Sequence, residues 1–107
     1  MSPDNKDIQK LQLLEQSMQN VLAQKNTFQT QLTELENALN EVTKSSTDPF
    51  KIVGGIMIES KKSTVIKDLK DKKEMLTLRV TTLEKQENKT REQIQSMQSD
   101  VVKSHKK

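Results

Sequence analysis

Mostly apolar residues recur along two long stretches of this 107-residue sequence at strictly alternating intervals of three and four residues. In the first stretch these positions are Leu11, Leu14, Met18, Val21, Lys25, Phe28, Leu32, Leu35, Leu39 and Val42. In the second stretch they are Ile66, Leu69, Lys73, Leu76, Val80, Leu83, Glu87, Thr90, Ile94, Met97 and Val101. A 3.5-residue repeat is typical of helices that supercoil around each other. The repeat therefore predicts two long helices, each with a narrow apolar seam.

The two stretches are related by a fold-back centred on Gly54. Antiparallel helices pair residues whose numbers have a constant sum, and a sum of 108 matches seam positions throughout, from Leu11 with Met97 onward. Half of that sum is residue 54, and Gly54 and Gly55 are the only glycines of the chain. The seam and the turn residues thus locate the same reversal. They predict a mainly α fold, a long antiparallel two-helix coiled coil with a short β-hairpin at the fold-back.

The fold-back contains the most apolar segment of the chain. Phe50–Val53 and Ile56–Glu59 read as two strands around a pair of glycines, which is a good signal for a two-residue hairpin. Both faces of that hairpin are apolar, and an isolated two-stranded hairpin is marginal in water. Either the segment collapses onto the helix ends, or strands of other chains bury it; we favour the second interpretation because an exposed edge of this composition is prone to aggregate. The predicted oligomerisation residues are Phe50, Ile52, Val53, Gly54, Gly55, Ile56, Met57 and Ile58.

Composition agrees with a single structural unit, residues 1–107, that is not a conventional globule. Only 31% of the residues are apolar and 2% aromatic, while 31% are charged, a balance that would suggest disorder if the seam were absent. We expect helix one over about residues 3–44, the hairpin over 50–59 and helix two over 62–104.

The charge is divided unequally between the two arms. Residues 1–47 carry a net charge of −2 and residues 61–107 one of +6, so the arms attract each other when the chain folds back. The sequence has no cysteine, no apolar run approaching the ~20 residues that cross a membrane, and no signal-peptide pattern. We therefore expect a cytoplasmic protein with no membrane partner.

Three charged residues occupy seam positions. Lys25 and Glu87 fall in adjacent layers and are predicted to form an ion pair across the seam, whereas Lys73 is predicted to lay its apolar stem along it. Polar seam residues set the register of a coiled coil at a cost in stability, which is the interpretation we favour for Lys25 and Glu87, and none of the three residues needs a catalytic role.

The free ends carry more apolar residues than one partner helix can bury. Leu13 and Val102 lie off the seam, and Ile8 extends the same region. Two interpretations stay open: such residues are common on protein surfaces, or they form an adaptable, Met-containing surface that grips apolar segments of other proteins. The predicted client-binding residues are Ile8, Leu11, Leu13, Leu14, Met18, Ile94, Met97, Val101 and Val102.

Catalytic and cofactor patterns are not found in the sequence. There is no Gly-rich phosphate loop, no nucleophile–base pair and no metal-ligand cluster, and His105 is the only histidine. We therefore expect a protein that is not an enzyme and that has no cofactor or metal. Lysines crowd residues 61–73, but Asp68, Asp71 and Glu74 interrupt them and no aromatic side chain is interleaved, so a solvated face is favoured over nucleic-acid binding.

The segment Phe50-Lys51-Ile52-Val53-Gly54-Gly55-Ile56-Met57-Ile58 between two long helices resembles the β-class subunits of prefoldin. That family shows an aromatic residue, Lys, an apolar residue, Val and Gly at this point, followed by an apolar strand. The segments 65–74 and 38–42 are also similar to the family. One departure is the short Ser-rich approach with Pro49 directly before the first strand, where the family often has a longer acidic linker.

The resemblance implies a hexamer of two α-class and four β-class subunits whose hairpins join into a β-barrel. It further implies an ATP-independent holdase that binds unfolded client polypeptides at its coiled-coil tips and passes them to a group II chaperonin. The basic residues Lys103, Lys106 and Lys107 are candidates for docking that chaperonin. The alternatives are a structural coiled-coil adaptor that binds one specific partner helix and, with less support, a helical hairpin associated with nucleic acid.

Overall fold

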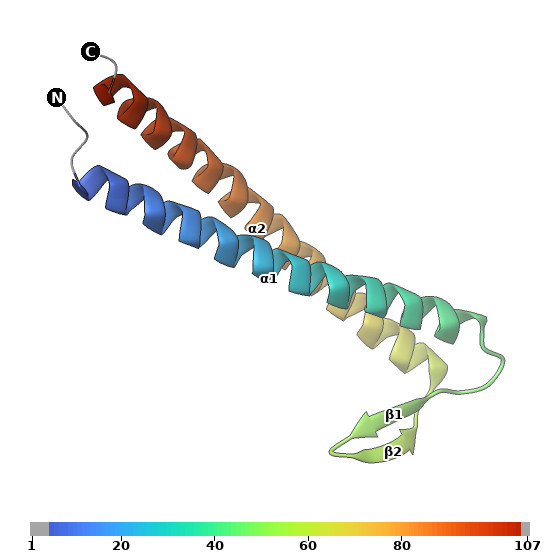
Figure 1. Ribbon diagram of the computed structural model, residues 1–107. Coiled ribbons are helices and arrows are strands. Elements are labelled where there is room, and N and C mark those ends of the chain that lie inside the picture. The colour runs from blue at the N-terminus through green and yellow to red at the C-terminus, as the bar shows by residue number, and fades with distance from the viewer. Residues whose placement is uncertain (1–4, 106–107) are drawn as a thin grey trace. The chain divides into compact units, whose positions relative to one another are not determined.

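The computed structural model describes residues 5–105, with side chains from Lys6 to Lys103. In chain order the elements are α1 (Asn5–Lys44), β1 (Phe50–Val53), β2 (Ile56–Glu59) and α2 (Lys62–His105), as Figure 1 shows. The prediction of two long helices with a short hairpin between them is confirmed. The expected start of helix one at residue 3 lies outside the described residues.

The connection from α1 to β1 terminates α1 and supplies a capping side chain for the start of α2. The Ser45 amide donates to the Glu41 carbonyl at 3.0 Å and closes the last turn of α1. Pro49 then excludes Asp48 from helical geometry. The Asp48 side chain accepts a hydrogen bond from the backbone N–H of Lys62 at 3.2 Å, so it satisfies one of the unpaired donors at the start of α2.

The chain divides into two compact units. Unit 1 comprises residues 1–27 and 80–107, and unit 2 comprises residues 28–79. In each unit a segment of α1 packs antiparallel against a segment of α2, and unit 2 also contains the hairpin. In unit 1 the first described residues of α1 and the last of α2 lie at the same end (Figure 1).

Burial follows the predicted seam in both units. Every seam position of α1 and α2 is buried or half-buried, and between residues 8 and 43 of α1 the one further residue that is not exposed is Ala38. The most buried side chains belong to unit 1 and are Val21, Val80, Leu83, Glu87 and Thr90. In unit 2 the described seam residues are half-buried, and none is as deeply enclosed as those five.

Candidate assembly and client-binding surfaces

The hairpin has the register that its two glycines impose. β1 and β2 pair antiparallel with Val53 opposite Ile56, and the Ser60 amide donates to the Pro49 carbonyl at 2.9 Å to close the base. Gly54 and Gly55 have φ values of +57° and +82°. Two positive φ values at the centre of a two-residue loop define a type I′ turn, whose twist matches that of the strands, and residues with a side chain rarely adopt them.

Both faces of the hairpin are apolar and uncovered. Phe50, Ile52 and Met57 lie on one face with exposures of 64%, 70% and 66%, and Val53, Ile56 and Ile58 lie on the other with 50%, 65% and 49%. Figure 1 shows the strands projecting from the helical part of unit 2. A monomer therefore leaves in water a set of side chains that is normally buried.

An ion pair joins the base of the hairpin to α2. Lys51 Nζ lies 3.8 Å from Asp68 Oδ2, and both side chains are about half exposed. Lys51 shares its face with Val53, Ile56 and Ile58, so this face borders the helices at its base and is open toward the turn.

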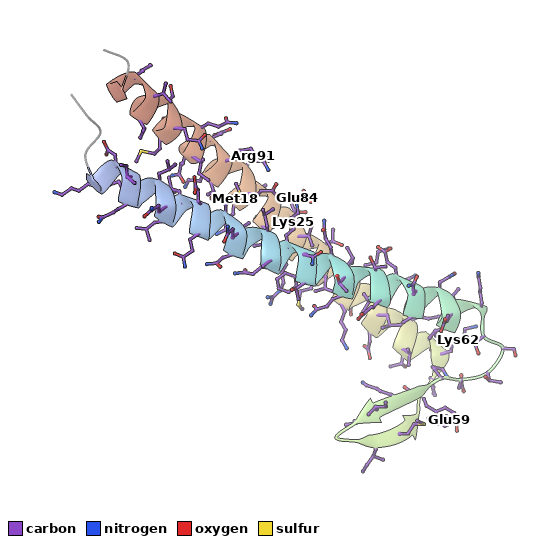
Figure 2. All side chains as sticks on the ribbon, viewed as in Figure 1. Met18, Lys25, Glu59, Lys62, Glu84 and Arg91 are labelled. Atoms are coloured by element: carbon purple, nitrogen blue, oxygen red, sulfur yellow. The ribbon has the colours of Figure 1, made fainter. Side chains whose placement is uncertain are left out.

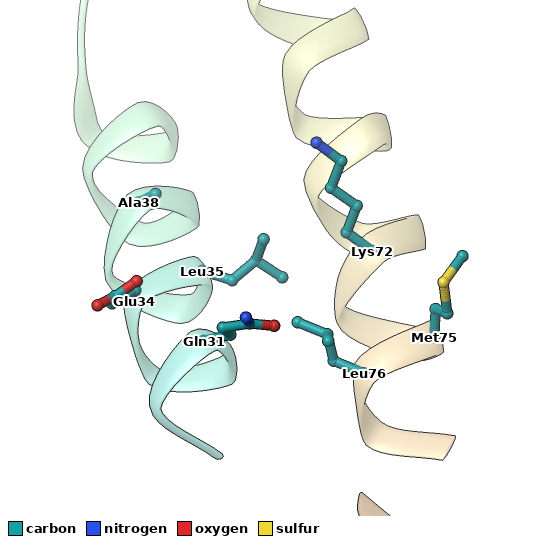
Figure 3. Close-up of a pocket in the computed structure, with 7 residues that line it drawn as sticks. All are labelled: Gln31, Glu34, Leu35, Ala38, Lys72, Met75 and Leu76. Carbon is teal, nitrogen blue, oxygen red and sulfur yellow. The ribbon is translucent and has the colours of Figure 1, made fainter. Parts of the chain in front are cut away.

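Two adjoining hollows run along one side of the helix pair in unit 2. The first has a volume of about 450 Å³ and is shown in Figure 3. It is lined by Gln31, Glu34, Leu35, Ala38, Lys72, Met75 and Leu76. The second, of about 270 Å³, shares Ala38 and Lys72 with the first and extends past Val42 and Leu69 to Phe50 on the hairpin. Together they form one groove, which we call the shaft groove, from the middle of unit 2 to the base of β1.

Unit 1 has a polar layer within its apolar seam. The Lys25 ammonium donates to Glu87 Oε1 at 2.6 Å, which confirms the predicted cross-seam ion pair. The Arg91 guanidinium donates to the other carboxylate oxygen, Oε2, at 2.5 Å and to Asn88 Oδ1 at 3.2 Å (Lys25 and Arg91 are labelled in Figure 2). Hydrogen bonds from Lys25 and then from Arg91 lower the pKa of the Glu87 carboxyl and outweigh the effect of its burial. Glu87 thus stays charged in the seam because two cations hold it.

The other polar seam residue, Lys73 of unit 2, is half-buried, and its ammonium lies 3.9 Å from Glu36 Oε1. Its stem follows the seam while its charge reaches a carboxylate at the edge. Nearby, the Arg79 guanidinium lies 5.5 Å from the centre of the Phe28 ring and covers the aromatic seam residue.

The residues predicted to bind clients divide into two groups in unit 1. Ile8, Leu13 and Val102 are exposed, with Leu13 the most open at 65%. The half-buried seam members are Leu11, Leu14, Met18, Ile94, Met97 and Val101. Glutamines 9, 12 and 16 surround Leu13 on α1 and form a shallow hollow of about 310 Å³.

Sequence reasoning missed three exposed apolar side chains. Leu22 in unit 1 and Met75 and Leu78 in unit 2 are 41%, 54% and 63% exposed. All three lie off the seam, which is the signal that could have found them. Of the candidate docking lysines, Lys103 is exposed near the end of α2, and Lys106 and Lys107 lie outside the described residues. Within residues 5–105 neither helix is long and apolar enough to span a bilayer.

The fold and its exposed hairpin define a class of protein, the subunits in which an apolar β-hairpin links two long antiparallel helices. Residues 5–107 match the family model described as prefoldin subunit. The chain therefore belongs to the prefoldin family, among its β subunits. This family is non-enzymatic and acts in a chaperone role.

Two prefoldin β subunits illustrate the similarity in sequence. The subunit of Sulfurisphaera tokodaii is 38% identical over 94 residues, which cover 86% of this chain and 75% of the relative. The subunit of Pyrobaculum calidifontis is 35% identical over 88 residues, 80% of this chain and 70% of the relative. The crystal structure of the prefoldin β subunit from Thermococcus strain KS-1 matches with a TM-score of 0.89 at 29% identity, over 95% of this chain and 91% of that one.

Proposed function

We propose that this chain is a subunit of an ATP-independent holdase that binds unfolded polypeptides at the free end of unit 1 and passes them to a group II chaperonin. The observation that carries the proposal is the set of exposed, off-seam apolar residues at that end, Ile8, Leu13 and Val102. The chain's own coiled coil cannot bury these side chains, because they lie outside the seam between its two helices. An unfolded client offers the apolar surface that would cover them.

In this proposal the hairpin builds the assembly. The partners are a prefoldin α-class subunit and further β-class copies, in a hexamer whose hairpins close into a β-barrel. Such closure would pair the free edges of β1 and β2 and bury the apolar face that is turned to the barrel interior. The exposure of all six large apolar hairpin side chains supports this, because a hairpin that worked alone would carry polar residues on at least one face.

A shallow surface can hold a client through several weak contacts made at the same time. A single exposed leucine contributes about 1 kcal/mol or slightly more when it is covered. Copies of the same surface, held together by the assembly, act at a high effective concentration on one long chain, so that modest contacts add up. The hold then needs no deep pocket and no single sequence motif in the client.

Handover to the chaperonin and a cytoplasmic location complete the proposal. Lys103 is exposed near the C-terminal end of α2, and Lys106 and Lys107 follow it in the sequence. These cations would dock an acidic surface, and that contact would weaken as salt is added.

The test uses Leu13→Asp combined with Val102→Asp in the assembled protein. We expect the double variant to keep its helix content and its oligomeric state and to lose suppression of aggregation for several unrelated, chemically denatured clients. Leu78→Asp is the matched control, because Leu78 is 63% exposed against 65% for Leu13 but lies in unit 2. Full suppression by the double variant would contradict client binding at the end of unit 1. A wild-type protein that ignores denatured clients and binds one folded helix would instead be an adaptor.

A further inference from the structure

The seam of unit 2 is less completely covered than its sequence warrants. Leucine fills most of its positions, yet among the described residues the five most buried side chains all belong to unit 1, whose seam contains Lys25, Glu87 and Thr90. An apolar seam that stays half-buried in the free chain still has transfer free energy to gain from another surface.

On one flank of this seam a short side chain borders a hollow. Ala38 follows Gln31 by one heptad, so the two residues occupy the same flank of α1. Figure 3 shows the Gln31 side chain directed toward α2, whereas the short Ala38 leaves the space beside Leu35 open. The result is the shaft groove, whose larger hollow measures about 450 Å³.

The groove leads to the hairpin. Its two hollows share Ala38 and Lys72, and the second reaches Phe50 at the start of β1. At its far end Met75 is 54% exposed. The apolar surface proposed for assembly is therefore not limited to the strands but continues down the helices of unit 2.

We propose that the shaft groove receives the apolar side chains of the hairpin of a second copy of this chain, so that each subunit's hairpin packs on its neighbour's helices as well as on its neighbour's strands. This inference rests on the assembly proposed above and names the surface that the hairpin meets. The face that carries Val53 and Ile56 is the candidate contact, because its base is tied to α2 by the Lys51–Asp68 ion pair while its outer part is uncovered.

Charge supports this occupant. The side chains that line the larger hollow include one carboxylate, Glu34, and one ammonium, Lys72, so its formal charge is balanced. A balanced, apolar groove fits an uncharged β-branched surface such as Val53 and Ile56 better than a strongly charged helix.

The absence of cysteine from the chain allows a direct test by cross-linking. One preparation carries Met75→Cys and a second carries Val53→Cys; the two are mixed, allowed to assemble alone or with an α-class subunit, and oxidised mildly. A disulfide needs Cα atoms within about 7 Å. We expect a mixed disulfide between copies for Met75→Cys and at least tenfold less for the control Leu78→Cys, which has similar exposure on the same helix. Equal yields, or none with Met75→Cys, would overturn the proposal.

A second measurement fills the groove. Ala38→Gln introduces the residue type that lies one heptad earlier, and Met75→Glu places a charge at the far end of the groove. Each substitution is expected to weaken assembly at least tenfold in sedimentation experiments, while the helix content stays unchanged. Ile56→Asp separates the two proposals. If it dissociates the assembly and the groove variants do not, the groove is not an interface but hairpin assembly stands; if none of the three dissociates it, hairpin assembly itself fails. Cross-linking of Met75→Cys to a cysteine-labelled unfolded client in the intact assembly, in place of a second copy, would also overturn the inference.

Discussion

Replacing Ile56 measures what the hairpin contributes to assembly. Ile56 keeps 65% of its surface exposed in the free chain, and complete burial of an isoleucine is worth about 1.5–3 kcal/mol, so each copy can still gain roughly 1–2 kcal/mol when a neighbour covers it. Ile56→Ala removes most of that gain, which corresponds to a roughly 5- to 30-fold weaker Kd per contact. Ile56→Asp also places an unpaired carboxylate in the interface at a cost of several kcal/mol, so we expect it to weaken the contact by at least a further ~100-fold.

Sedimentation velocity over a range of concentrations, with circular dichroism on the same samples, tests this. The helix content should be unchanged in both variants, because the seams of the helices do not include residue 56. Leu13→Asp is the matched control: its side chain is also 65% exposed in the free chain but belongs to the helical part of unit 1, so the oligomer should survive. An unchanged Kd for Ile56→Asp, or an equal loss for Leu13→Asp, would refute the argument that the exposed hairpin drives assembly.

Three further outcomes follow from individual residues. Leu83→Ala should lower the free energy of unfolding in urea by about 2–3 kcal/mol and Leu78→Ala by less than ~0.5 kcal/mol, because their exposures are 6% and 63%; similar losses would contradict the seam. Gly54→Asn should preserve assembly, since Asn-Gly favours a type I′ turn, whereas Gly55→Val should weaken it at least ~10-fold because valine resists a φ of +82°; tolerance of valine would argue against this turn. The folded pKa of Glu87 lies below its ordinary value of 4.5, so its stabilising effect is complete above that value and is lost as the pH falls through the folded pKa; acid titration of wild type should show this loss, and Glu87→Gln should show less of it.

The helical part of the fold was predictable because periodicity is a local property of the sequence. A residue at every third or fourth position must lie on one side of a helix, and every seam position in both units is buried or half-buried. The position of the chain reversal could be predicted equally well, since the only two glycines mark it and half of the constant sum of paired residue numbers is 54, the number of one of them. The Lys25–Glu87 pair followed from the same register, because the register places these two opposite charges in adjacent layers of the seam.

Other features depend on side-chain geometry that a heptad pattern does not contain. Asp48 precedes Pro49 and reads as a turn residue, but its carboxylate reaches the first amide of α2, fourteen residues later in the chain. The ion pair between Arg91 and Glu87 could have been predicted, because Arg91 follows Glu87 by four residues on the same helix face. The shaft groove could not have been predicted from the heptad pattern, because it depends on a small side chain at one flank position and on the shapes of the side chains around it.

The candidate sites differ from the fold for a further reason: they are defined by surfaces that the chain cannot cover by itself. In unit 2, strands with apolar residues on both faces exceed what one layer of helices can bury, so their partner must supply a second layer. In unit 1, Leu13 and Val102 lie beside the two-helix seam and not in it, so the proposed client has to cover them from outside the coiled coil. A strand forms its backbone hydrogen bonds only with another strand in a defined register, so the hairpin requires a partner of fixed geometry, as in a closed barrel. Single helix residues surrounded by glutamine amides impose no such geometry, and this is the physical reason to assign assembly to the hairpin and variable clients to the end of unit 1.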